Sequence, residues 1–92
     1  MPSIEVAVNH SEGLHVRPAA LFVKLATTYP CKILVRNLST NSPLVNAKSV
    51  LGILTLGVNS GSLIRIEADG DRANEALEGL NRLILSNFGD GL

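Results

Sequence analysis

The sequence predicts one α+β domain whose elements follow the order β-α-β-β-α-β-α. Segments that alternate apolar and polar residues carry the period-2 signature of half-buried strands. Longer segments place apolar residues at helical spacing along one face. A four-stranded sheet covered on one face by helices would give every apolar face a partner layer. Periodicity leaves the order of the strands open.

The composition fits a single domain over residues 1–92 and excludes several classes of function. Hydrophobic residues make up 46% and aromatic residues 3%, so Ala, Val, Ile and Leu must form the core. The eight basic and eight acidic side chains cancel, and Trp is absent. We therefore expect neither the basic stripe nor the stacking platforms of a nucleic-acid-binding protein.

The cysteine content and the apolar stretches point to a cytoplasmic protein. The single Cys31 excludes an internal disulfide and a Cys-rich metal cluster. The first residues lack the basic region and apolar run of a signal peptide. No apolar stretch approaches the ~20 residues of a membrane helix, so we expect no membrane insertion.

The alternation that predicts strands is clearest over residues 62–68, where Ile64, Ile66 and Ala68 point to one face. The predicted strands cover residues 4–8, 31–36, 44–46 and 62–68. Turn formers predict loops over residues 9–13, 37–43 and 59–61, with His10 as a turn residue.

The first predicted helix begins near Val16 and ends near Tyr29, because a residue before proline is pushed out of the α region. The second covers residues 48–56, with Ser49 at or near its N-cap. Residues 69–71 are predicted to provide a turn and the cap of the third helix. We expect residues 87–92 to pack little. The apolar faces of the first and third helices are Ala19, Phe22, Val23 and Ala26, and Ala73, Ala76, Leu77, Leu80, Leu83 and Ile84.

The stretch that points to chemistry is residues 13–20, Gly-Leu-His-Val-Arg-Pro-Ala-Ala. It puts His15 where a loop becomes a helix, and a helix N-terminus has free amides and partial positive charge that favour an anion. Arg17 adds a guanidinium fork that matches phosphate oxygens, and Gly13 permits a close backbone approach. The same field disfavours protonated imidazole and so preserves the lone pair that can attack phosphorus.

The residues alone leave a second interpretation of His15 open, because a histidine at a helix start is more often a cap or a solvated residue. A metal site is disfavoured, since His10 is the only other histidine and lacks partners at ligand spacing. We therefore predict no metal and no cofactor.

Residues 13–20 resemble the active-site signature of HPr, the phosphocarrier family of the bacterial phosphoenolpyruvate-dependent sugar phosphotransferase system. A second block over residues 46–57, Asn-Ala-Lys-Ser-Val-Leu-Gly-Ile-Leu-Thr-Leu-Gly, resembles the family's regulatory-serine segment. The resemblance runs from Ile4 to about Phe88. It implies an open-faced β-sandwich, a four-stranded antiparallel sheet with three helices on one face.

The resemblance also implies a function, that of a carrier and not an enzyme. Nδ1 of His15 would accept phosphate from enzyme I and donate it to enzyme IIA proteins, while Arg17 steadies the phosphoryl group. Ser49 matches the serine that an HPr kinase/phosphorylase modifies in many relatives, and a transcription regulator is a further partner of this kind. A phosphate on Ser49 would add about −1.5 to −2 charges beside an apolar docking patch. The residues expected to contact partners are Val50, Leu51, Leu54 and Lys24.

Some features depart from the sugar-system pattern. Glu12 stands where relatives often have a small polar residue, and the loop over residues 37–43 looks longer than usual. Residues 34–37 and 85–90 resemble NPr, the nitrogen-regulatory paralogue. An alternative is therefore a regulatory or nitrogen-branch paralogue that acts mainly through protein–protein interaction.

Overall fold

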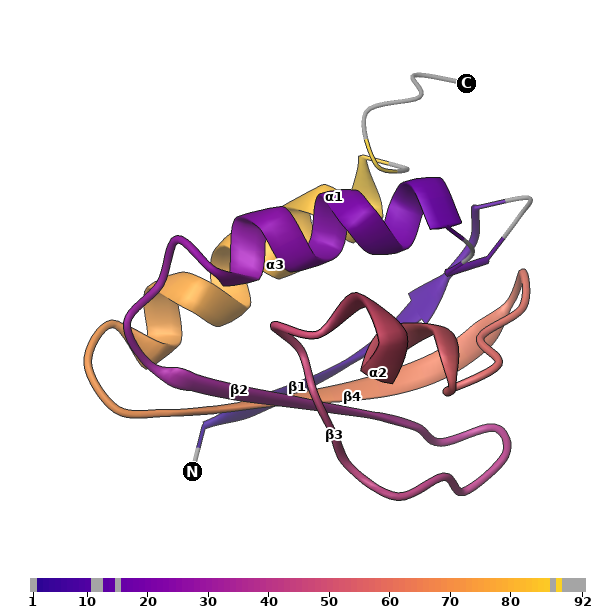
Figure 1. Ribbon diagram of the computed structural model, residues 1–92, viewed down its shortest axis with the longest axis horizontal. Helices are drawn as coiled ribbons and strands as arrows, with labels where there is room; N and C mark the ends of the chain where they lie inside the picture. The colour runs from indigo at the N-terminus through magenta and orange to yellow at the C-terminus, as the bar shows by residue number, and fades with distance from the viewer. Residues whose placement is uncertain (1, 11–12, 15, 87, 89–92) are drawn as a thin grey trace.

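The computed structural model describes residues 2–10, 13–14, 16–86 and 88. Within this part of the chain the predicted order β-α-β-β-α-β-α is confirmed (Figure 1). The elements are β1 (Ser3–Val8), α1 (Val16–Ala26), β2 (Lys32–Asn37), β3 (Val45–Asn46), α2 (Val50–Leu54), β4 (Ser62–Asp69) and α3 (Ala73–Leu85). They form an open-faced β-sandwich, in which the three helices lie on one face of an antiparallel sheet.

The sheet has the strand order β1-β4-β2-β3, so β4 and β2 are its central strands. The alternation predicted for β4 is confirmed, because Ile64, Ile66 and Ala68 are all buried. Val6 of β1 stands opposite Ile64, and Val35 of β2 stands opposite Ile66. The register therefore lines up the apolar residues of neighbouring strands beneath the helices.

Helix α1 buries the predicted residues but ends at Ala26 and not near Tyr29. The N–H groups of Thr28 and Tyr29 donate to the carbonyls of Leu25 and Ala26, at 3.0 and 3.2 Å. Because these hydrogen bonds reach back three residues and not four, they tighten the last turn and end the α-helix.

Helix α2 is shorter than the predicted 48–56, but Ser49 is its N-cap as expected. The Ser49 hydroxyl accepts a hydrogen bond from the Gly52 N–H at 3.1 Å. The Asn46 side chain accepts from the Lys48 N–H at 2.9 Å. This local turn gives the Lys48 amide a partner outside the helix, so α2 starts later than periodicity suggests.

The predicted cap for α3 within residues 69–71 is wrong. The N-cap is Arg72, which has a left-handed backbone (φ 62°) and makes no side-chain capping bond. Its guanidinium pairs with Glu75 at 3.0 Å, and this hydrogen bond and charge raise the pKa of Arg72. The guanidinium also lies 5.4 Å from the centroid of the Tyr29 ring. Gly79 of α3 leaves room for that ring, since a Cβ there would collide with the Tyr29 hydroxyl.

Three residues predicted to lie in loops or in the tail are buried. Asn37 belongs to β2, and its side-chain amide donates to the Leu56 carbonyl at 3.0 Å. His10 is only 4% exposed and Phe88 only 3%, so they are neither a surface turn residue nor a loosely packed end. The other residues of the predicted loose tail, 87 and 89–92, lie outside the described part.

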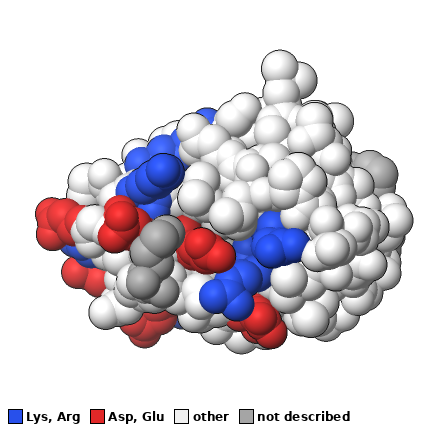
Figure 2. Space-filling model, turned by 90° about the horizontal axis from the view of Figure 1, so that it is seen from below, with Lys and Arg blue, Asp and Glu red and all other residues white. Residues whose placement is uncertain are grey.

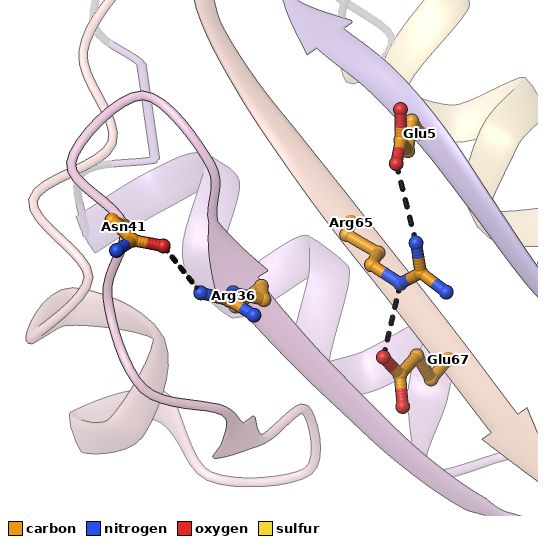
Figure 3. Close-up of polar contacts among 5 residues, drawn as sticks. All are labelled: Glu5, Arg36, Asn41, Arg65 and Glu67. Atoms are coloured by element: carbon orange, nitrogen blue, oxygen red, sulfur yellow. Dashed lines mark hydrogen bonds and ion pairs between the residues drawn. The ribbon is translucent and has the colours of Figure 1, made fainter.

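The face of the sheet opposite the helices mixes charges of both signs (Figure 2). Arg65 of β4 lies 3.2 Å from Glu5 and 3.0 Å from Glu67 (Figure 3). Arg36 stands opposite Arg65 in the register and donates to the Asn41 side chain at 2.6 Å. Two like charges directly opposite would repel, and these acceptors offset that repulsion.

Candidate functional site

The backbone just before His15 is held by hydrogen bonds to two other segments. The Gly13 N–H donates to the His10 carbonyl at 2.9 Å, which closes a turn after β1. The Leu14 N–H donates to the Val58 carbonyl at 3.0 Å, in the loop between α2 and β4. The Leu14 side chain is buried, so this residue is fixed by packing as well as by hydrogen bonding. His15 and Glu12 lie outside the described residues.

Gly13 makes the close backbone approach that the sequence predicts. Its φ is +63°, in the left-handed region that favours glycine. A Cβ here would overlap the Val58 carbonyl oxygen and lie 2.8 Å from the Asn59 Cα. No side chain fits between these two backbone segments, so the loop geometry requires glycine.

Helix α1 begins at Val16, the residue after His15 in the sequence. Its first turn contains no acidic residue and carries Arg17, which is exposed. Pro18 is buried in that turn, where its missing N–H costs no hydrogen bond. The partial positive charge of a helix start and the guanidinium of Arg17 both favour an anion at this end of α1.

Of the expected partner-contacting residues, Val50, Leu51 and Lys24 are exposed and Leu54 is not. Leu51 is 77% exposed, a high value for a leucine, while Leu54 packs against the core. Leu54 therefore contributes less to a partner-contacting surface than was expected from the sequence.

Sequence reasoning missed Val16, which is 69% exposed beside His15 in the chain. Helical spacing would assign Val16 to the buried stripe with Ala19 and Val23, so only the structure identifies it as exposed apolar surface at the site. Helices α1 and α2, which carry these side chains, pack against each other.

The described residues contain no group of three or more His, Cys, Asp or Glu side chains that could hold a metal ion. No helix in the described part is both long and apolar enough to cross a membrane.

The fold is that of a small α+β domain, and comparison with known proteins places it among the phosphocarriers. Residues 2–86 match the family described as "PTS HPr component phosphorylation site". Phosphocarrier protein HPr of Pseudomonas aeruginosa is 35% identical over 92 residues, covering 99% of both chains. A Multiphosphoryl transfer protein of Haemophilus influenzae is 39% identical over 90% of this chain, which spans only 17% of that larger protein.

A crystal structure of HPr-C-His from Thermoanaerobacter tengcongensis matches with a TM-score of 0.93 and 40% identity, covering 100% of both chains. The chain therefore belongs to the HPr family of phosphotransferase-system phosphocarriers. The nitrogen-branch alternative is not favoured by these relatives.

Proposed function

We propose that this chain is a cytoplasmic phosphocarrier in which Nδ1 of His15 takes a phosphoryl group from phospho-enzyme I and passes it to enzyme IIA proteins. A bond from Nδ1 to phosphorus forms while the bond from phosphorus to the donor breaks, and the second transfer reverses these roles. Enzyme I is itself charged by phosphoenolpyruvate. The chain acts as a covalently modified carrier and not as an enzyme with a small-molecule pocket.

The observation that carries this proposal is the hydrogen-bonded, closely packed backbone at Gly13 and Leu14, directly before His15 in the sequence, together with the start of α1 at Val16. Phosphoryl transfer depends mainly on positioning and on stabilising charge. The first-turn amides of α1 and the Arg17 guanidinium supply the charge, and the hydrogen-bonded loop supplies the positioning.

The relay is tested with labelled phosphoenolpyruvate, magnesium, enzyme I and an enzyme IIA protein. With a small, catalytic amount of this chain, the label is expected to move from enzyme I to enzyme IIA over many turnovers. If the label remains on enzyme I, or reaches enzyme IIA equally fast without this chain, the relay is refuted.

Partner docking is proposed at the exposed apolar side chains of α1 and α2, Val16, Val50 and Leu51, and at the exposed Lys24 in the last turn of α1. Ser49 lies at the N-cap of α2, directly before Val50 and Leu51. An ATP-dependent HPr kinase/phosphorylase that modifies Ser49 would place negative charge next to this apolar surface and impair docking. A transcription regulator could then read the modified form.

We predict that Ser49→Asp slows phosphorylation by enzyme I about tenfold, equivalent to roughly 1.4 kcal/mol, and leaves the melting temperature almost unchanged. Stability is retained because Asp caps a helix N-terminus about as well as Ser. The matched control is Ser49→Asn, which caps equally well but carries no charge. Rapid-quench kinetics and thermal unfolding measure the two effects. Equal slowing in both variants would show that charge is not the cause.

A further inference from the structure

Phe88, which follows α3 in the sequence, packs against His10, close to the segment that leads to His15. The two rings meet edge to face, with centroids 5.7 Å apart and an interplanar angle of 79°. Both side chains are almost fully buried, at 3% and 4% exposure. The contact therefore joins the chain after α3 to the turn after β1.

Phe88 makes this contact from an unfavourable backbone conformation. Its φ is +56°, in the left-handed region, which is uncommon for a bulky residue other than glycine. Such conformations persist where the surrounding packing over-determines them, and they cluster at functional sites. The ring is thus held in place by its neighbours and not by local backbone preference.

Hydrogen bonds link His10 to the backbone that precedes His15. The His10 carbonyl accepts from the Gly13 N–H at 2.9 Å, and Leu14 is bonded to Val58 at 3.0 Å. Through His10, Phe88 therefore supports the hydrogen bond from Gly13 that holds the backbone before His15. A side chain on a distant part of the chain can act on the reaction in this way without touching the phosphoryl group.

We propose that Phe88 is a positioning residue for phosphoryl transfer, because its ring fixes His10 and thereby the turn through Gly13 that leads to His15. This inference rests on the function proposed above. Because Phe88 is buried, a docked partner does not contact it. Its loss should therefore change the rate of transfer more than the affinity for enzyme I.

The test compares Phe88→Leu, which keeps apolar bulk but removes the ring, with Phe88→Tyr, which keeps the ring. Leu85→Ala is the control, since Leu85 is 68% exposed at the end of α3. We expect Phe88→Leu to lower kcat for phosphorylation about tenfold and to leave KM within about twofold, since small misplacements of reacting groups are costly. Phe88→Tyr should recover most of the rate, and Leu85→Ala should resemble the wild type.

A second measurement follows the positioning itself, by amide hydrogen exchange at Gly13 in the unphosphorylated chain. We expect exchange at Gly13 to accelerate in Phe88→Leu and to return toward the wild-type rate in Phe88→Tyr. If the wild type is phosphorylated and Phe88→Leu matches it in kcat, or raises only KM, the inference fails while the proposed function stands. If the wild type accepts no phosphate, both fail. Unchanged Gly13 exchange in Phe88→Leu also overturns the inference.

Discussion

Replacing Gly13 by alanine is expected to destabilise the domain by about 3 kcal/mol, from left-handed backbone strain and from overpacking. For a domain of this size that corresponds to a fall in melting temperature of roughly 12–24 °C. The added Cβ would overlap the Val58 carbonyl oxygen and lie 2.9 Å from the Asn59 carbonyl carbon. To relieve this overlap, Gly13 must move away from Val58 and Asn59. That movement weakens the hydrogen bond from the Leu14 N–H to the Val58 carbonyl. Transfer at a temperature where the variant is folded should also slow.

Gly57→Ala is the matched control for this prediction. Gly57 has almost the same φ, +62° against +63°, but nothing lies within 4 Å of a Cβ built there. Its substitution should cost only the backbone strain, about 1–2 kcal/mol. Thermal or urea unfolding of both variants separates strain from collision. Equal losses would contradict a close approach at Gly13.

Replacing Arg17 by alanine is expected to slow phosphorylation of His15 about 100-fold, comparable to the loss of one preorganised donor to a developing charge. Arg17 lies in the first turn of α1, two residues after His15 in the sequence. Lysine keeps the charge but lacks the planar fork that binds two phosphate oxygens, so Arg17→Lys should recover only part of the rate. Because Arg17 is exposed, the free energy of unfolding should change little.

Single-turnover phosphorylation by phospho-enzyme I measures this effect, and Arg82→Ala supplies the control. Arg82 is also an exposed arginine on a helix, but it lies in the last turn of α3. Its removal lowers the net charge equally. Equal slowing in the two alanine variants would mean that overall charge, and not a phosphate contact, is responsible.

Sequence patterns predicted the elements whose form depends on local spacing. The strand alternation in β4 and the buried face of α1 were confirmed, because periods of two and 3.6 residues follow directly from backbone geometry. The Ser49 cap was also confirmed, since a cap involves only nearby residues. The layer rule predicted a sheet covered on one face by helices. The antiparallel pairing came from the family resemblance, because periodicity carries no information on strand pairing.

The features that sequence patterns missed depend on contacts between distant segments or on competing side-chain bonds. The buried Asn37 donates to the Leu56 carbonyl, and the buried His10 packs against Phe88. Neither partner is visible from local sequence. The early end of α1 reflects carbonyls taken by hydrogen bonds from Thr28 and Tyr29, which compete with a further helical turn.

The sequence predicted which residue types form the candidate site, but not which distant segments hold them in place. A glycine before the histidine predicted a close approach, while Val58 and Asn59, the segment it approaches, emerged only from the fold. Val16 was missed because its helical spacing matches the buried stripe. The roles of His15, Arg17 and Ser49 remain predictions, and the first of them is the central one.

The most direct test is to incubate the chain with enzyme I, magnesium and phosphoenolpyruvate and to measure intact mass and phosphorus NMR. We expect the wild type to gain one acid-labile, base-stable phosphoryl group, and His15→Ala to gain none. His10→Asn, which changes the other histidine, should still reach the phosphorylated mass after long incubation. A phosphoryl gain that persists in His15→Ala, or no gain in the wild type, would contradict the assignment of His15 as the phosphate carrier.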